Sequence, residues 1–223
     1  MPTAKGGYHL KDGTKVPSVT QILSRFKESG GLLAWAFTQG RAAERGEIKS
    51  LYDKRDEAGS SGTLAHELVE KYLNGEPDPD LSSYSDAIVE AAKQGFENYK
   101  RWAEDNRIEI LYLEIPLVSE VHSFAGTPDG IGKDSRGRLT LLDFKTSTGG
   151  PYLDWLAQTA AYKLLWEECY PDQPITGGIH LLRFSKENAD FHHHFWQDLS
   201  EAEELFLLLR KAFDLDKRLK KRL

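Results

Sequence analysis

The sequence predicts a single α+β domain with a mixed central sheet flanked by helices. Apolar residues recur at helical spacing in several segments before Asn106, and strand-like runs rich in apolar residues take over from Ile108. A helical segment from Pro151 to about Cys169 then separates two groups of strands. Helices and strands that come in separate runs are typical of the α+β class. A chain of 223 residues with 39% hydrophobic content is of a size that usually stays one domain.

Residues 1–106 are expected to form a mainly helical lobe that follows a short hairpin. Asp12-Gly13 lies between two short strand-like runs, which is a strong hairpin signal. Ser18 and Gln21 form a capping box, and the helix that they start is expected to pass Phe26 and to end at Gly30-Gly31. Amphipathic spacing predicts three further helices, at residues 32–58, 62–74 and 84–106.

Residues 107–223 are expected to form the sheet core and a closing helix. An antiparallel meander is predicted at residues 108–118, 123–131 and 138–144, in which the turn 134–137 joins the last two strands. Two more strands are predicted after the helix, at residues 175–184 and 191–196. The closing helix should run from Ser200 to about Leu219, with Ser200 and Glu203 as its capping box.

Composition excludes several kinds of protein. The single cysteine, Cys169, cannot form an internal disulfide, a four-cysteine zinc site or a cysteine-ligated iron–sulfur cluster within one chain. No apolar run approaches the roughly 20 residues of a membrane helix, and Met1 to Leu10 lacks the apolar segment of a signal peptide, so we expect a cytoplasmic protein. The net charge of -6 by itself disfavours a nucleic-acid partner, but it does not report a local basic surface.

Two acidic residues and a lysine follow a pattern that brings them together. Asp129 lies where Gly126-Thr127-Pro128 interrupts a strand, and Asp143 and Lys145 occupy alternate positions of the next strand, about fourteen residues later. Alternate residues of a strand face the same side, and in a hairpin Asp129 can face that side as well. Two carboxylates in one pocket repel each other unless a cation lies between them. A hard divalent ion there would suit phosphodiester hydrolysis.

The same residues resemble those of a known nuclease superfamily. Pro128-Asp129 followed by Asp143-Phe144-Lys145 matches the PD-(D/E)xK motif, with Gly62-Thr63-x-x-His66 before it and Gln158-x-x-x-Tyr162 after it. This order resembles the RecB-like branch, which includes phage and mitochondrial genome-maintenance exonucleases. The opening from Pro17 to Leu23, followed by Trp35, is similar to the start of those members. The resemblance covers about Tyr8 to Tyr162 and implies a restriction-endonuclease-like fold.

The resemblance also implies roles for individual residues. His66, Asp129, Asp143 and the main-chain carbonyl of Phe144 would bind Mg²⁺, for which Mn²⁺ could substitute, and Lys145 would be catalytic together with the two aspartates. A second group would contact the substrate or orient the site: Gln158, Tyr162, Glu70, Thr146 and Trp35. CRISPR-adaptation relatives use several cysteines for an iron–sulfur cluster. Because this chain has only Cys169, no cluster is expected here.

The resemblance implies a Mg²⁺-dependent deoxyribonuclease. We expect an exonuclease that acts on single-stranded DNA or DNA ends in replication, recombination or repair, with a recombination or replication protein as a possible partner, in a bacterial cell or in the cytoplasm of a phage host. Two alternatives stay open: a structure-specific endonuclease, and a noncatalytic DNA-binding or assembly module that retains the fold. The sequence decides neither the polarity of digestion nor the oligomeric state.

Plainer interpretations exist for several of these residues. A lone histidine such as His66 is more often a satisfied helix residue, and Gln158 and Tyr162 could simply pack their helix on the sheet. The tryptophans are typical core residues. The consecutive histidines 192–194 point to alternating faces of a strand and cannot all bind one ion, so they are interpreted as ordinary strand residues.

Overall fold

A computed structural model describes residues 7–27, 30–47, 60–185 and 189–223, with the backbone alone at residues 30–35 and 60. Its helices are α1 (Val19–Phe26), α2 (Gly30–Glu44), α4 (Ser60–Asn74), α5 (Asp86–Asn106), α6 (Leu153–Cys169) and α7 (Ser200–Lys220). Its strands are β1 (Tyr8–His9), β2 (Lys15–Val16), β3 (Glu109–Leu113), β4 (Leu117–Ser119), β5 (Phe124–Gly126), β6 (Gly130–Lys133), β7 (Leu139–Thr146), β8 (Ile179–Phe184) and β9 (Phe191–Trp196).

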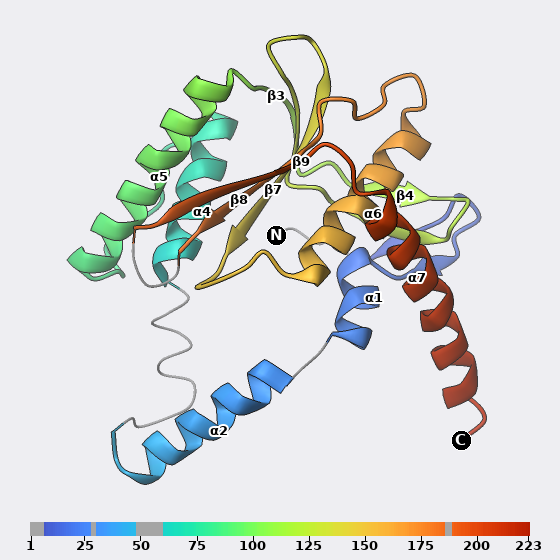
Figure 1. Ribbon diagram of the computed structural model, residues 1–223, viewed down its shortest axis with the longest axis horizontal. Coiled ribbons are helices and arrows are strands. Elements are labelled where there is room, and N and C mark those ends of the chain that lie inside the picture. The colour runs from blue at the N-terminus through green and yellow to red at the C-terminus, as the bar shows by residue number, and fades with distance from the viewer. Residues whose placement is uncertain (1–6, 28–29, 48–59, 186–188) are drawn as a thin grey trace.

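A five-stranded mixed sheet in the order β3-β6-β7-β8-β9 forms the centre of the molecule (Figure 1). Strands β3, β6 and β7 pair antiparallel, β7 and β8 pair parallel, and β9 returns antiparallel to β8. Parallel neighbours need a crossover connection, and α6 supplies it. The predicted α+β fold, with a mixed central sheet and flanking helices, is therefore confirmed.

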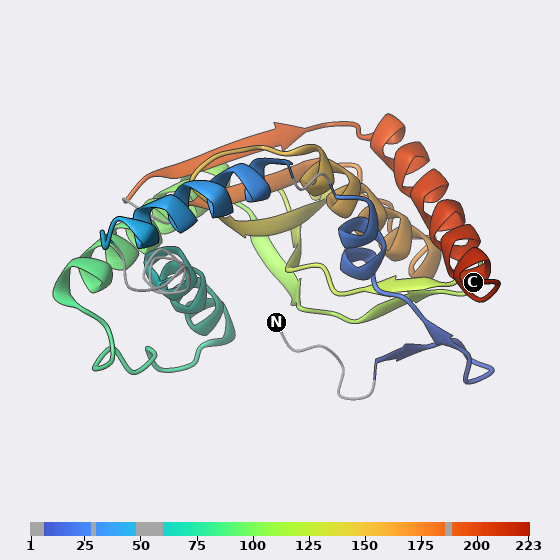
Figure 2. The same cartoon turned by 90° about the horizontal axis from the view of Figure 1, so that it is seen from below.

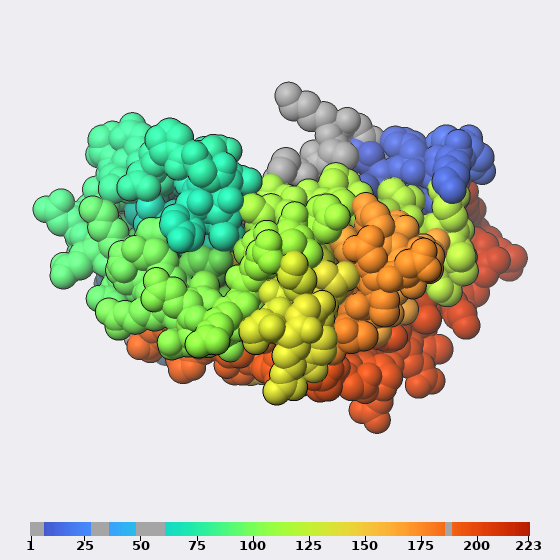
Figure 3. Space-filling view, turned by 90° about the horizontal axis from the view of Figure 1, so that it is seen from above, coloured from blue at the N-terminus to red at the C-terminus, as the bar shows by residue number. Residues whose placement is uncertain are grey.

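Each face of the sheet carries its own hydrophobic core, because successive side chains of a strand point to opposite faces. Helices α1, α6 and α7 cover one face, and α4 and α5 cover the other (Figures 1 and 2). Leu141 lies in the first core and Leu142, its neighbour on β7, in the second. In the space-filling view, α4 and α5 lie at one end of the molecule and the β1–β2 hairpin at the other (Figure 3).

The predicted meander is wrong in one respect, because two of its strands are broken. The strand expected at residues 108–118 is divided into β3 and β4, and the strand at 123–131 into β5 and β6. Glu114 has a left-handed backbone (φ 45°), and Pro116 and Pro128 lack the N–H that a continuous ladder needs. As a result β4 and β5 leave the central sheet and form a hairpin of their own.

The N-terminal elements agree with the prediction except at two helix ends. The β1–β2 hairpin and the Ser18–Gln21 capping box are both present. Helix α1 ends at Phe26, and Gly30 begins α2 instead of ending α1. Helix α2 ends at Glu44, before the left-handed Gly46 (φ 73°), so its predicted continuation is wrong at residues 45–47, and the rest of it, residues 48–58, lies outside the described part of the chain.

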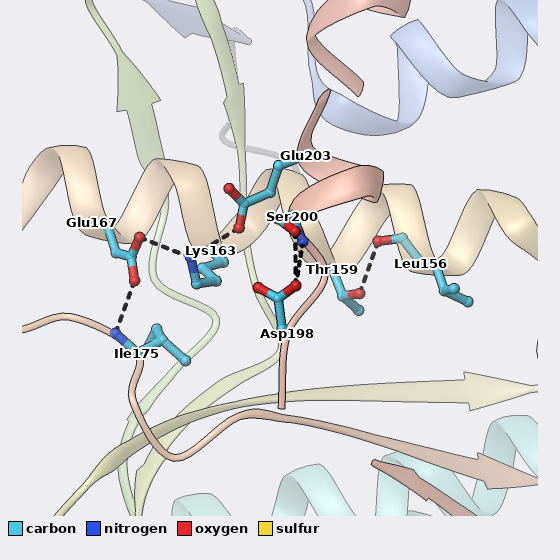
Figure 4. A network of polar contacts seen from close by, with 8 residues as sticks. All are labelled: Leu156, Thr159, Lys163, Glu167, Ile175, Asp198, Ser200 and Glu203. Carbon is cyan, nitrogen blue, oxygen red and sulfur yellow. Dashed lines mark hydrogen bonds and ion pairs between the residues drawn. The ribbon is translucent and has the colours of Figure 1, made fainter. Parts of the chain in front are cut away.

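The predicted capping box at the start of α7 is absent. Leu199 occupies the N-cap position, and Asp198 Oδ2 accepts hydrogen bonds from the backbone N–H and the hydroxyl of Ser200. The carboxylate of Glu203 points to α6 instead, where it accepts from Lys163 Nζ at 2.8 Å (Figure 4). An ion pair between two helices has replaced the local cap and ties α7 to the crossover helix.

Among the described residues, no helix combines the length and the apolar character that a membrane crossing requires.

The packing of α7 on the β4–β5 hairpin generates a stability prediction. Phe206 is fully buried, with its ring centroid 4.8 Å from that of Phe124. Phe206→Ala should lower the free energy of unfolding by about 3–5 kcal/mol, the usual cost of removing a buried phenylalanine ring. Leu208→Ala, two residues further on the same helix but 55% exposed, is the matched control and should cost less than about 0.5 kcal/mol. Urea unfolding of both variants measures the difference; equal losses would contradict this packing.

Candidate active site

Asp129, Asp143 and Lys145 meet where β7 extends beyond the start of β6. The β6–β7 ladder stops at the pair Gly130–Leu142, so the last residues of β7 have no β6 neighbour. Asp129, just before β6, occupies this place, and its Oδ2 accepts a hydrogen bond from the backbone N–H of Phe144 at 2.7 Å. The side chain therefore caps the unpaired part of β7 and is fixed beside Asp143.

Asp143 is fully buried, and its carboxylate forms an ion pair with a neighbouring lysine. Oδ2 lies 2.5 Å from Lys145 Nζ, and this ion pair is itself mostly shielded from solvent. Both carboxylate oxygens are buried, and neither has a hydrogen-bond partner among the described residues. A buried carboxylate oxygen without a partner is costly, because burial removes its water and nothing replaces it. The local geometry thus leaves a buried negative oxygen available to a cation.

Burial changes the pKa of each ionisable group in this cluster. It raises the pKa of Asp143 to about 6, opposed by Lys145 and reinforced by Asp129. It also raises the pKa of Asp129, against the effects of Lys145 and the Phe144 N–H. Burial lowers the pKa of His66, which outweighs the attraction of Glu70 and Asp143 and favours the neutral imidazole. Neutral imidazole is the form that binds metal ions.

Two further carboxylates, Glu70 and Glu114, lie near the cluster, and the sequence predicted a role only for Glu70. Glu114 is the other: its backbone N–H donates to the carbonyl of Asp129, and its charge raises the pKa of Asp129. Burial and the charge of Glu70 in turn raise the pKa of Glu114. An acidic residue at the end of a strand, two residues before Pro116, was the only sequence signal for it.

The Gly62-Thr63-x-x-His66 segment lies against the end of β7. Thr146 Oγ1 donates to the carbonyl of Gly62 at 3.1 Å, and a Cβ on Gly62 would lie 2.2 Å from the Thr146 methyl group. The glycine thus permits α4 to begin in contact with the strand that carries Asp143. One turn later, the His66 ring packs on the Phe144 ring with centroids 5.5 Å apart.

Gln158 and Tyr162 lie on α6, on the other side of the cluster. Gln158 Nε2 donates to the Tyr162 hydroxyl at 2.8 Å, and both side chains are buried. Burial raises the pKa of Tyr162, and the charge of Asp143 raises it further, which places this hydroxyl near the aspartates. A Cβ on Gly126 would lie 2.7 Å from the Tyr162 ring, so the glycine before Pro128 admits this ring.

Trp35 lies in α2, where the structure describes only the backbone at that position, and the side chain falls outside the described residues.

The residues present fit a divalent cation. Asp129 and Asp143 supply carboxylate oxygens, and the carbonyl of Phe144 points to the same side as its N–H, toward Asp129, because both groups of a strand residue point one way. Hard oxygen donors of this kind suit Mg²⁺. In the described ranges no three His, Cys, Asp or Glu side chains converge closely enough to hold an ion as they stand. Lys145 is the cation that contacts Asp143 in this arrangement.

No family model and no curated protein sequence matches this chain. Among solved structures, one from Eubacterium rectale named "Putative exonuclease" is similar, with a TM-score of 0.48 and 12% identity over 73% of this chain and 68% of that one. An alkaline exonuclease from Laribacter hongkongensis is similar over 75% of this chain and 93% of its own, with a TM-score of 0.31 and 13% identity. A structure of that exonuclease in complex with dAMP is similar over 75% of this chain and 92% of its own, with a TM-score of 0.27 and 13% identity. Likenesses this low do not assign a function.

The Gln158–Tyr162 hydrogen bond leads to a second prediction. Tyr162→Phe should leave the buried amide without its acceptor and lower the free energy of unfolding by about 1–3 kcal/mol. Combining it with Gln158→Leu should cost less than the sum of the two single changes, because the double variant leaves neither group unpaired. A double-mutant cycle from urea unfolding measures this coupling. Strictly additive losses would show that the two side chains do not depend on each other.

Proposed function

We propose that this protein is a divalent-metal-dependent deoxyribonuclease that hydrolyses phosphodiester bonds at Asp129, Asp143 and Lys145. One observation carries the proposal: the fully buried carboxylate of Asp143 lies beside a second buried aspartate and a lysine, and among the residues that the structure describes its oxygens have no hydrogen-bond partner. A structural ion pair would be expected to have its buried oxygens satisfied. Perturbed carboxylates that cluster in this way are typical of functional sites.

Four groups would hold the metal: the carboxylates of Asp129 and Asp143, the Phe144 carbonyl and the His66 imidazole. When bound, Mg²⁺, or Mn²⁺ in its place, would neutralise phosphate charge and lower the pKa of water. The nearby carboxylates of Glu70 and Glu114 add negative potential that favours a cation here. Burial raises the pKa of both carboxylates, that of Asp143 to about 6, so a metal has to compete with protons for them.

Lys145 would act on the reacting phosphate as a donor. Its ammonium group carries three N–H bonds and has no lone pair while it is paired with Asp143 Oδ2. It can therefore hold the attacking water by its oxygen, or donate to a nonbridging phosphate oxygen as negative charge develops there. Displacement of the ammonium from Asp143 by a bound metal would leave Nζ beside the site, ready for either contact.

The recessed position of the site supports a flexible substrate. Asp143 is fully buried and the Lys145 side chain is only 12% exposed, with α4 on one face of the sheet and α6 on the other. A phosphate that reaches Asp143 has to approach a buried carboxylate, and a single strand or a frayed end bends toward such a group more readily than a rigid duplex. Together with the RecB-like order of motifs, this favours exonuclease action on single-stranded DNA or DNA ends.

Digestion of end-labelled DNA tests the proposed activity. Linear single-stranded, linear duplex and closed circular DNA are incubated with Mg²⁺, Mn²⁺ or EDTA. The expected result is cleavage of linear single strands with either metal, none with EDTA, and no cleavage of the circle. Cleavage of the circle would replace the exonuclease with an endonuclease.

Substitutions in the cluster link the activity to this site. Asp143→Ala and Lys145→Ala should each lower the cleavage rate by at least about a hundredfold, the scale of a lost proton-transfer or charge-stabilising group. Lys133→Ala, which removes a lysine of β6 paired with Glu109, is the control and should retain full activity. Undiminished cleavage by both site variants would refute the proposal.

Metal affinity should depend on pH. Below pH 6 a proton occupies Asp143 in the metal-free protein, because its pKa is raised to about 6, and the metal has to displace that proton. Mg²⁺ affinity should then rise as the pH increases through about 6, by about tenfold per pH unit for each proton that the metal displaces. Isothermal titration calorimetry between pH 5 and 8 measures this. An affinity that does not change with pH would contradict binding at Asp143.

A further inference from the structure

Strand β9 carries a row of three flat side chains on one face. His192, His194 and Trp196 occupy alternate positions, with ring centroids 6.5 Å apart for the first pair and 5.9 Å for the second. Their planes are nearly parallel, at 13° and 19°. His193 points to the other face, where its ring packs on those of His180 and Trp102. The alternation of the strand thus places His193 in the packed interior of one face, and His192 and His194 in the row on the other.

The row is continuous with the candidate active site across the sheet. Lys145 of β7 pairs with Arg183 of β8, which pairs with His192 of β9, so these three side chains share one face. Two residues earlier on β7, Asp143 pairs with Leu181 of β8, which pairs with His194 of β9, on the same face. Two strand spacings separate Lys145 from His192, which corresponds to about 10 Å.

Solvent reaches the row, and its electrostatic surroundings favour an anion. His192 is exposed, His194 is partly exposed with its Nε2 buried, and Trp196 is partly exposed with part of its ring packed against the core. Burial, His192 and Arg183 all lower the pKa of His194, whereas a neighbouring carboxylate would raise it. Arg183 is buried beneath this face and donates to the Ser147 carbonyl at 2.7 Å, so its charge is fixed between the row and Lys145.

Flat rings beside fixed positive charge fit one class of ligand. Proteins that bind single-stranded nucleic acid combine aromatic surfaces, on which bases stack, with cations that follow the phosphates. We propose that His192, His194 and Trp196 form a stacking platform for bases of the DNA single strand whose phosphate lies at Lys145. This inference rests on the proposed function and adds to it the path of the strand, from β7 across β8 to β9.

Binding of two labelled strands in EDTA separates base contacts from phosphate contacts. The first probe is a single-stranded oligothymidine, and the second has the same length and phosphates but abasic sugars. His192→Ala with His194→Ala should weaken oligothymidine binding by at least about twentyfold and His192→Ala alone by at least about fivefold, since each stacked base contributes measurably to affinity. Binding of the abasic strand should be unchanged. Fluorescence anisotropy gives both dissociation constants.

Two further variants serve as controls. His122→Ala removes an exposed histidine from the β4–β5 turn and should leave both affinities unchanged. His192→Phe with His194→Phe keeps flat rings and should restore oligothymidine binding, which a merely structural effect of the alanine changes would not predict. Thermal unfolding of each variant verifies that the fold is retained.

Two results would overturn the inference. Equal oligothymidine affinity for the wild-type protein and the alanine variants would show that no base stacks there. Equal losses for oligothymidine and the abasic strand would assign the histidines to phosphate contacts instead of stacking. The proposed function fails separately if the wild-type protein does not cleave linear single-stranded DNA with Mg²⁺ or Mn²⁺, because the binding measurements in EDTA do not depend on hydrolysis.

Discussion

The constraint on which the site depends is the burial of the Asp143 carboxylate, which forms an ion pair with Lys145 but has no hydrogen-bond partner in the part of the chain that the structure describes. Removing a carboxylate from water costs free energy that a single ammonium group only partly returns. The raised pKa of Asp143 expresses this cost, and Asp129 increases it. A second cation would relieve the same cost. The burial of this carboxylate therefore accounts both for the local instability of the cluster and for its capacity to bind a metal.

The fold creates this situation through the length of one strand. Because β7 continues past the β6 pairing, Asp129 can replace a strand partner and bond to the Phe144 N–H. Helices on both faces then shield the same strand end. Thr146 fixes the start of α4 to it through Gly62, and the Tyr162 ring of α6 approaches through the space that Gly126 leaves. The glycines Gly62 and Gly126 thus allow α4 and α6 to approach the end of β7, whereas the polar residues supply the chemistry.

The sequence could predict what depends on local rules. The alternation of Asp143 and Lys145, the Ser18 capping box and the turn before β7 are properties of neighbouring residues, and the structure contains all three. It could not predict what depends on distant partners. Glu203 forms an ion pair with Lys163 of α6 instead of capping its own helix. Glu114 lies beside Asp129 because its left-handed backbone divides the predicted strand there. The row formed by His192 and His194 likewise became visible only when the pairing of β7, β8 and β9 placed it level with Lys145.

The most direct measurement of the central claim is the position of a metal ion in crystals of the protein grown with Mn²⁺. An anomalous difference map should show a peak between the carboxylates of Asp129 and Asp143, with the Lys145 ammonium moved away from Asp143 Oδ2. Full Mn²⁺ saturation with no peak at these carboxylates, and with the Lys145–Asp143 ion pair unchanged, would contradict a metal-dependent site in this cluster.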